Sequence, residues 1–423
     1  MDKIEELRKN ISIMDEKEID RRLKADMFTD EARPIAEEEL QRKRPFREET
    51  EELVEHRLQF VGSGSEYFRI WIVNLLFSIV TFGFYSAWAK VRREQYFHRN
   101  TLLDGSGFDY HGNPKSIFKG RIIAVALLAV LAQIDRMAHD FYYPVVLVLS
   151  PLIPWLMIRS FIFRSRNTSF RGLHFDFHGT YKGFCKVFLG PLIVLIALSG
   201  IWLYRIPLLV SWSLSFDKAM QVMQGMLAMT LIGAFLLIPV LLQRFKAFQF
   251  NHLAFGASRF ESRLGLKSFY GICLRAFVLV LLIAGAAFAP VLVAIASITG
   301  DAVIAVAWGI ILAYVVIFIV QQPYFVALLS NLVWNNTRLE KHGFRSDQTF
   351  GGIFRIVAGN WLFIIFTLGL YWPWAKIRIA RYRAEHTAVL VAGSLDDFIG
   401  GATQQQSAIG EEIADAFDFD IGF

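Results

Sequence analysis

The chain has 423 residues, of which 54% are hydrophobic, 15% are aromatic and only 19% are charged, and its net charge is +6. A soluble globular protein usually carries about 25% charged residues, so this composition excludes an ordinary cytosolic enzyme. The apolar residues are concentrated in runs of about 20 residues, the length that a helix needs to cross the hydrocarbon core of a bilayer. The sequence therefore predicts a mainly α, polytopic membrane protein.

The charge pattern divides the chain into three parts. Residues 1–57 contain 13 Lys and Arg against 18 Asp and Glu, and their apolar positions lie near helical spacing, so we predict a charged, helical, cytoplasmic region. Residues 58–400 carry the apolar runs and form the predicted transmembrane domain, and residues 401–423 form an acidic tail. The first apolar run begins only near Tyr67 and is too long for a cleaved signal peptide, so we expect none.

Six long apolar segments are each able to cross about 30 Å of hydrocarbon as a helix, and they group into three hairpins. They cover residues 117–138, 141–163, 183–204, 222–245, 269–297 and 303–333. Two further segments, 67–92 and 353–378, have a shorter apolar stretch that ends in a Thr-x-Gly-x-Tyr sequence followed by Trp and Lys. We predict that each of these two is a short re-entrant or half-hairpin segment, with a single span as the competing interpretation.

The orientation follows from the basic residues in the connections. The connections 90–121, 159–186, 244–275 and 335–355 together contain 23 Lys and Arg against 7 Asp and Glu, whereas the alternate connections contain 3 against 4. The basic side is expected to be cytoplasmic, and the chain is expected to cross the membrane several times. We expect the N-terminus on that side too.

An internal repeat is the strongest signal in the chain. Pro154, Pro239, Pro323 and Pro373 are each followed 14 residues later by Thr168, Leu253, Thr337 and Thr387, and Ala87 stands in the same relation to Thr101. Seven residues after four of these positions lie Phe108, Phe175, Phe260 and Phe344, and nine residues further lie Ile117, Phe184, Phe269 and Ile353. The repeat predicts a unit of one helix, a small cytoplasmic β-hairpin and the next helix. Successive hairpins would pair side by side as a platform.

Two copies of one motif carry a resemblance to a known family. The segment TFGFYSAWAKVRREQYFHRNTLLDG (81–105) and its second copy TLGLYWPWAKIRIARYRAEHT (367–387) resemble the YjgN-like family of bacterial inner-membrane proteins. The matching positions are Thr81, Gly83, Tyr85, Trp88, Ala89, Lys90, Arg92, Asn100, Thr101 and Gly105, and in the second copy Thr367, Gly369, Tyr371, Trp374, Ala375, Lys376, Arg378 and Thr387. The second copy departs from the motif at Glu385 and His386. The resemblance covers about residues 58–400 and implies a multi-spanning protein without an assigned activity.

Catalytic and metal-binding signatures are weak. The sequence contains no HExxH, G-x-S-x-G, Walker or Rossmann motif, so no hydrolase, NTPase or dinucleotide enzyme is predicted. His174, Asp176 and His178 would share one face of a strand and could bind a metal ion, but the neighbouring hairpin has Gly107 in place of the first histidine. We therefore predict no metal, no cofactor and no nucleic-acid partner, with these three residues as the weak metal candidate.

Charged residues near the membrane give the better functional clue, because charges at membrane depth are costly. Arg121, Arg159 and Arg275 lie near the ends of apolar segments, where they could contact lipid or an anion, although simple interfacial anchoring is the common role of such residues. We therefore expect membrane lipid as a partner.

Two functions remain open at this point. The first is a non-catalytic transporter-like, channel-like or lipid-interacting protein for a small solute, ion or lipid, which the helix breaks and the basic connections favour. The second is a membrane scaffold or regulator that holds a partner protein through residues 1–57 or the acidic tail. An enzyme is the third and least supported alternative.

Overall fold

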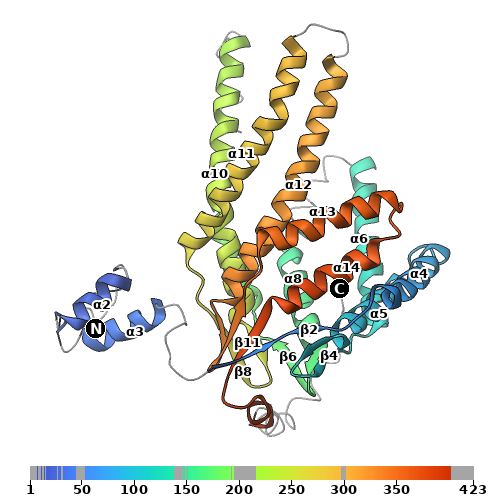
Figure 1. The fold of residues 1–423 in the computed structure, drawn as a ribbon. Coiled ribbons are helices and arrows are strands. Elements are labelled where there is room, and N and C mark those ends of the chain that lie inside the picture. Colours follow the sequence, from blue (N-terminus) through green and yellow to red (C-terminus); the bar gives the residue numbers. More distant parts are fainter. Residues whose placement is uncertain are drawn as a thin grey trace.

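The structure is a computed structural model. It describes most of residues 7–43, residues 53–137, 151–191, 216–296 and 302–401, and a few isolated positions between these ranges. Long helices extend from the strand ends on one side of a β-sheet, and α10, α11 and α12 lie side by side in Figure 1. The main helices of the described residues are α2 (Glu16–Lys24), α3 (Arg33–Lys43), α4 (Gly64–Val80), α5 (Ser86–Arg99), α6 (Pro114–Met137), α8 (Leu152–Arg166), α10 (Phe216–Asn251), α11 (Leu266–Ala296), α12 (Ala302–Trp334), α13 (Phe350–Phe366) and α14 (Trp372–Glu385).

One continuous antiparallel sheet of 11 strands connects the helices. Its strands are β1 (Leu53–Arg57), β2 (Gln59–Phe60), β3 (Thr101–Leu103), β4 (Ser106–Tyr110), β5 (Thr168–Phe170), β6 (Leu173–Phe177), β7 (Leu253–Phe255), β8 (Ser258–Ser262), β9 (Thr337–Leu339), β10 (His342–Ser346) and β11 (Thr387–Ala392). Their order in the sheet is β1-β11-β10-β9-β8-β7-β6-β5-β4-β3-β2. The hairpins therefore pair side by side, but they do not form a flat platform.

The sheet closes almost completely on itself, and we call it the ring. Its two edge strands, β1 and β2, are consecutive in the chain and are separated only by Leu58. The Leu58 N–H donates to the Thr387 carbonyl at 3.0 Å, and the Val61 N–H donates to the Asn100 carbonyl at 3.0 Å. The gap between the edges is therefore bridged by the chain itself, which leaves little open edge for another strand to pair with.

Four hairpins of the ring have the same dimensions. The first strand of each has three residues and the second has five. In two of them, both turn residues have positive φ, namely Asp104 (50°) with Gly105 (72°) and Arg171 (48°) with Gly172 (85°). Two consecutive positive φ angles match the type I′ turn that fits the twist of a two-residue hairpin. The short turns all lie at the rim of the ring away from the helices.

The core lies inside the ring and at the rim where the helices begin. Leu103, Phe170, Phe260 and other buried residues form one cluster within the ring. At the start of the helices that follow the hairpins, the repeat positions Ile117, Phe184, Phe269 and Ile353 are nearly inaccessible, with exposed fractions of 0–3%. Ile117 and Phe184 pack with the ring residues Tyr110 and Phe177, whereas Phe269 and Ile353 pack mainly with neighbouring helices, and this apolar burial holds the starts of the helices in place.

Three helices among the described residues are long and apolar enough to cross a membrane. Their spans are Pro114–Ile134, Leu266–Ala286 and Tyr314–Trp334. Of the other predicted segments, 141–163 and 183–204 lie partly outside the described residues, and 222–245 lies within the 36-residue helix α10. Six spans in three hairpins therefore remain a prediction.

The two shorter segments each form a pair of helices. The α4–α5 hairpin turns at residues 81–85, and the α13–α14 hairpin turns at residues 367–371. Each pair begins after one strand of the ring and ends at another strand, so the chain returns to the side from which it left. The side chains at the two tips are strongly exposed, as Phe82 (93%) and Leu368 (95%) illustrate.

The N-terminal helices α2 and α3 pack on each other. Ile11, Ile19, Ala32, Ala36 and Leu40 form a small buried cluster between them. The ring begins at Leu53, five residues before residue 58, where the charge pattern puts the boundary. The acidic tail from residue 402 lies outside the described residues.

Candidate functional site

The ring encloses an apolar chamber of about 180 Å³. Its wall includes the phenylalanines that the repeat marks seven residues after each helix end, namely Phe108, Phe175, Phe260 and Phe344. Neighbouring strands add further rings, and the ring centroids of Phe108 and Phe170 are 4.7 Å apart and those of Phe175 and Phe255 are 4.8 Å apart. An apolar cavity of this kind stays dry and accepts apolar groups.

Two polar residues of the wall have their polar atoms engaged elsewhere. The Oγ1 of Thr387 donates to the Arg383 carbonyl at 2.8 Å. The Nδ1 of His342 accepts from the Ala392 N–H at 3.2 Å, and its imidazole stands edge-on to Phe398 at 4.3 Å between centroids. The chamber therefore presents hydrocarbon rather than reactive groups to an occupant.

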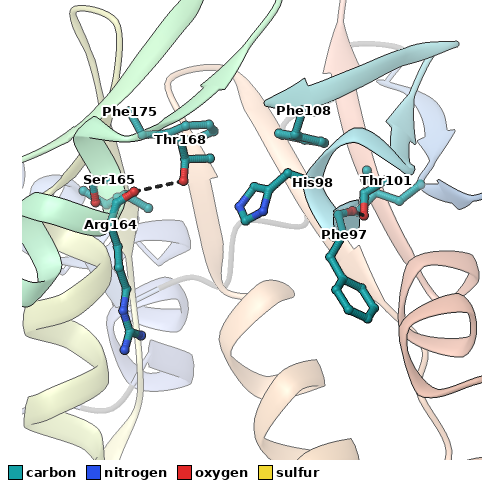
Figure 2. A pocket seen from close by; sticks show the side chains of 10 residues that line it. Phe97, His98, Thr101, Phe108, Arg164, Ser165, Thr168 and Phe175 are labelled. Atoms are coloured by element: carbon teal, nitrogen blue, oxygen red, sulfur yellow. Dashed lines mark hydrogen bonds between the residues drawn. The ribbon is translucent and has the colours of Figure 1, made fainter. Parts of the chain in front are cut away.

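A second, wider pocket of about 420 Å³ adjoins the chamber on the helix side, and we call it the mouth. The mouth and the chamber share the wall residues Leu58, Phe108, Phe175 and Leu253. The ends of α5 and α8 contribute the polar part of the mouth through His98 and Arg164, and Figure 2 shows the Arg164 side chain extending away from the strands. The mouth thus combines an apolar inner wall with a cationic outer edge.

A short helix over residues 395–401 closes the other end of the ring, and it is the red coil below the strands in Figure 1. Leu395, Phe398 and Ile399 pack into the ring cluster. Arg171, from the turn between β5 and β6, pairs with Asp396 and also with Asp104 at 3.0 Å. The chamber is therefore closed at the turn side, and the mouth adjoins it at the helix side.

The rim between helices and strands has one recurring arrangement. In five units, the residue before the strand that follows a helix contacts the carbonyl four positions earlier through a side-chain nitrogen at 2.7–2.9 Å. These residues are Asn100, Asn167, His252, Asn336 and His386. The threonines that follow in four of the five units also donate to the carbonyl four positions earlier, at 2.7–2.9 Å. Both contacts bring side-chain donors to carbonyls in the last turn of a helix, and some of these carbonyls, such as those of Tyr96 and Phe163, also accept a backbone N–H. At His386, the position that departs from the motif, the imidazole makes the contact that asparagine makes elsewhere.

Comparison with known proteins assigns the family. The model of the family described as "Bacterial protein of unknown function (DUF898)" matches residues 55–416, which is most of the chain. The chain belongs to the DUF898 family.

Relatives of the DUF898 protein are named for their location. The chain is 28% identical over 366 residues to the inner membrane protein YjgN of Salmonella typhimurium (strain LT2), covering 81% of this chain and 89% of the relative. It is 24% identical over 361 residues to YjgN of Escherichia coli (strain K12), covering 81% and 90%. The DUF898 protein is thus a YjgN-like membrane protein, as its motif residues suggested. No solved structure matches the chain.

The Thr-x-Gly-x-Tyr residues of the DUF898 protein form the tips of the two helical hairpins. The Oγ1 of Thr81 accepts from the Tyr85 N–H at 3.0 Å, and the Oγ1 of Thr367 accepts from the Tyr371 N–H at 3.0 Å. Gly83 and Gly369 have φ angles of 90° and 92°, a region that favours glycine. The motif therefore encodes a tight helix–helix turn with an apolar tip.

The Trp-Ala-Lys-x-Arg residues lie on the returning helices. Trp88 stacks on Tyr85 and Trp374 stacks on Tyr371, with interplanar angles of 12° and 15°. Lys376 lies over the Trp372 ring, 4.9 Å from its centroid. These contacts pack the motif residues against the turns, and the alanines between them, Ala89 and Ala375, continue the helices.

The three arginines that sequence suggested for lipid or anion contact lie on three different helices. Arg121 on α6 donates to the Ser86 hydroxyl, and the guanidinium of Arg159 on α8 lies over Trp155 at 5.4 Å. Arg275 lies on α11, where its charge acts on Tyr324. The residues that line the chamber and its mouth in the described structure do not include any of the three.

The weak metal candidate does not assemble. The Nδ1 of His174 contacts the Arg166 carbonyl at 2.8 Å, and Asp176 pairs with the Arg166 guanidinium at 3.0 Å. His178 uses its backbone N–H on the His252 carbonyl. No group of three or more His, Cys, Asp or Glu within the described ranges is arranged to hold a metal ion.

Sequence reasoning did not find the chamber, although one signal for it was present. The phenylalanine at a constant interval in four hairpins pointed to a shared environment, but only the closure of the sheet makes that environment a cavity. Two tyrosine hydroxyls also escaped notice. Tyr96 accepts the Ser63 N–H and Tyr382 accepts the Thr349 N–H, each at 2.9 Å, so both fasten the start of a hairpin to its returning helix.

Proposed function

We propose that this DUF898 protein is a non-catalytic inner-membrane protein that binds a lipid, with an acyl chain of the lipid held inside the ring. The observation that carries the proposal is the apolar chamber with its mouth at the helix side. An acyl chain moving from the bilayer into such a wall exchanges one hydrocarbon environment for another and exposes no chain to water.

The position of the ring relative to the membrane is part of the proposal. The basic connections form the hairpins of the ring and the adjoining helix ends, so the positive-inside rule places the ring in the cytoplasm with the helices spanning above it. The six long segments would then cross the membrane, and the α4–α5 and α13–α14 hairpins would dip in and return. Their exposed tips, Phe82 and Leu368, suit burial in lipid.

The closed floor favours a binding site over an open channel. The helix over residues 395–401 fills the turn side of the ring, so an occupant enters and leaves through the mouth. The apolar wall likewise favours binding over catalysis, since it offers no positioned acid, base or nucleophile to an acyl chain. The function therefore lies in holding or presenting a lipid.

Photolabelling in membranes tests the proposal. The full chain is reconstituted in vesicles of phosphatidylglycerol and phosphatidylethanolamine that contain a phospholipid with a diazirine at the end of its acyl chain, and labelled peptides are located by mass spectrometry. Adducts on the strands that line the chamber are expected. Adducts confined to the long helices would contradict the proposal, because a chain that stays in the bilayer cannot reach the ring.

Val389→Phe provides a variant with a matched control. Val389 lines the chamber, so a phenylalanine there reduces the free volume and should lower ring labelling several-fold. Val54→Phe makes the same change on the neighbouring strand β1, where the side chain is exposed, and should leave labelling unchanged. Equal labelling in both variants would remove the chamber from the proposal.

A protein partner at the N-terminal region is a second proposal. Helices α2 and α3 pack their own small core, which leaves their charged surfaces available to another protein. Deleting residues 1–44 keeps β1 and the ring intact, and should abolish capture of that partner while membrane insertion continues. Unchanged capture after the deletion would rule out this region as the binding surface.

A further inference from the structure

Four cations gather where α5, α6 and α8 meet beside the mouth. Val91 of α5, Ile117 of α6 and Phe163 of α8 pack in one buried cluster. Lys90 precedes Val91 in the chain and Arg164 follows Phe163, so both residues adjoin members of this cluster. The half-buried Lys90 lies within electrostatic range of Arg93, Arg121 and Arg164. We call Lys90, Arg93, Arg121 and Arg164 the basic cluster.

The described residues supply little negative charge to the basic cluster. Glu94 is the acidic residue whose charge acts on Lys90, and it is bound by Arg93 at 2.9 Å. Arg121 donates to the neutral hydroxyl of Ser86. Tyr110, which packs in the same apolar cluster, is neutral at physiological pH, since burial above all raises the pKa of its hydroxyl to about 12.

Like charges held together at a partly buried position repel one another unless an anion lies among them. Arginine and lysine together are the usual partners of phosphate, arginine through paired N–H donors and lysine as a point charge. Arg164 belongs both to the basic cluster and to the mouth of the chamber, so an anion bound here would sit where the apolar wall ends.

We infer that the basic cluster binds the phosphate headgroup of an anionic phospholipid whose acyl chain enters the chamber. This inference rests on the proposed function and adds the class of lipid to it. The pocket that carries the cationic edge shares wall residues with the apolar chamber, and together they match the two ends of an anionic amphiphile. A zwitterionic lipid carries an additional positive charge that the basic cluster repels.

The test compares headgroups with one photoreactive chain. Vesicles of phosphatidylcholine receive a trace of diazirine phosphatidylglycerol or of diazirine phosphatidylcholine, and the adducts on the ring strands are counted. Ring labelling by phosphatidylglycerol should exceed that by phosphatidylcholine. In the double variant Lys90→Gln/Arg164→Gln, the ratio of ring labelling by phosphatidylglycerol to ring labelling by phosphatidylcholine should fall about fivefold for each cation removed. Labelling by phosphatidylcholine should persist.

Arg166→Gln is the matched control. Arg166 lies two residues after Arg164 but pairs with Asp176 on β6 and is absent from the lining of the mouth, so its replacement should keep the preference for phosphatidylglycerol. Equal ring labelling by the two lipids in the unaltered protein would overturn this inference and leave the proposed function standing. Absence of ring labelling by either lipid would overturn the proposed function itself.

Inorganic phosphate separates a lipid site from a site for the free anion. Equilibrium dialysis in phosphatidylcholine vesicles should retain equal amounts of phosphate with the unaltered protein and with the double variant. Phosphate retained by the unaltered protein and lost in the double variant, together with no headgroup preference in the ring, would assign the cluster to the free anion and overturn the inference.

Discussion

The two helical hairpins share a turn but differ inside. Asn74 of α4 and Asn360 of α13 occupy the same place before their tips, seven residues ahead of Thr81 and Thr367. Asn360 donates to the Ala375 carbonyl at 3.2 Å and accepts from Arg378 at 3.0 Å. Asn74 is similarly buried, yet its Oδ1 has no hydrogen-bond partner among the described residues.

The difference shows that one motif supports two interiors. Arg92 corresponds to Arg378, but its guanidinium lies 3.3 Å from the Tyr85 hydroxyl at the tip instead of on the asparagine. The α13–α14 hairpin is therefore joined by an internal polar contact that the α4–α5 hairpin lacks. A buried polar atom without a partner costs about 1–3 kcal/mol, so the α4–α5 hairpin should be the looser of the two.

The largest expected effect comes from the place where the two hairpins touch. A Cβ on Gly64 at the start of α4 would lie 2.1 Å from Cδ1 of Trp374 on α14. Gly64→Ala should therefore force the hairpins apart and cost about 1–3 kcal/mol, read as a lower thermal midpoint of the purified protein in detergent. Gly351→Ala at the start of α13 meets no atom within 4 Å and is the control. Equal midpoints for the two variants would show that the contact does not hold the hairpins together.

The internal asparagines should respond in opposite ways. Asn360→Leu removes both hydrogen bonds of a buried side chain, to the Ala375 carbonyl and from the Arg378 guanidinium, and should destabilise the protein by about 2 kcal/mol. Asn74→Leu replaces a side chain by one of similar volume and removes the unsatisfied oxygen. This variant should therefore be neutral or stabilising. Thermal unfolding followed by tryptophan fluorescence compares them. A similar loss in both variants would mean that Asn74 has a partner in the folded protein and that the two hairpins are equivalent.

The turns should respond alike, because their hydrogen bonds have the same length in both hairpins. Thr81→Val or Thr367→Val removes the acceptor of the Tyr85 or Tyr371 N–H and should cost about 1 kcal/mol in either case. The corresponding serine variants keep the hydroxyl and serve as controls. A marked difference between the two valine variants would place the asymmetry at the tips as well as in the interior.

Much of the ring could be predicted from the repeat, but its closure could not. The interval from Pro154 to Thr168 marks the start of a strand in every unit because the same side chains end each helix and begin each hairpin. Closure depends on β1 and β2, which lie outside the repeat and meet at Leu58. No local pattern around Leu58 indicates that β1 pairs with β11 and that β2 pairs with β3. Strands β3 and β11 are more than 280 residues apart in the chain.

The chamber and the basic cluster were beyond a single sequence for a related reason. Phe108, Phe175, Phe260 and Phe344 were recognisable as one face of four hairpins, but only the curvature of the sheet turns that face inward. Likewise, Arg121 was recognisable as a charge near the membrane, whereas its proximity to Lys90 arises from the packing of α5 on α6. Spacing along the chain gives the elements, and contacts between units give the site.

The smallest effect is expected where the hairpins end at the ring. The α5 end is tied by Arg99 to Asp109 at 2.9 Å, whereas at the α14 end the Glu385 carbonyl accepts from Arg57 at 2.9 Å. Burial alone would raise the pKa of Asp109, but the hydrogen bonds from Arg99 and from the Tyr110 N–H and the charge of Arg99 together hold it below its ordinary value.

A carboxyl whose pKa is lower in the folded protein contributes stability above its unfolded pKa and loses that contribution as the pH falls through the folded value. Unfolding measured from about pH 6 down to about pH 3 should therefore show a smaller acid-induced loss in Asp109→Asn than in the unaltered protein. The difference should stay below about 1 kcal/mol because the pair is exposed.

The main-chain contact at the α14 end does not titrate in this range, so Arg57→Gln should leave the Asp109 contribution to the acid-induced loss in place. If Asp109→Asn left the acid response unchanged, the ion pair would not hold the α5 end, and the two ends would differ only in sequence.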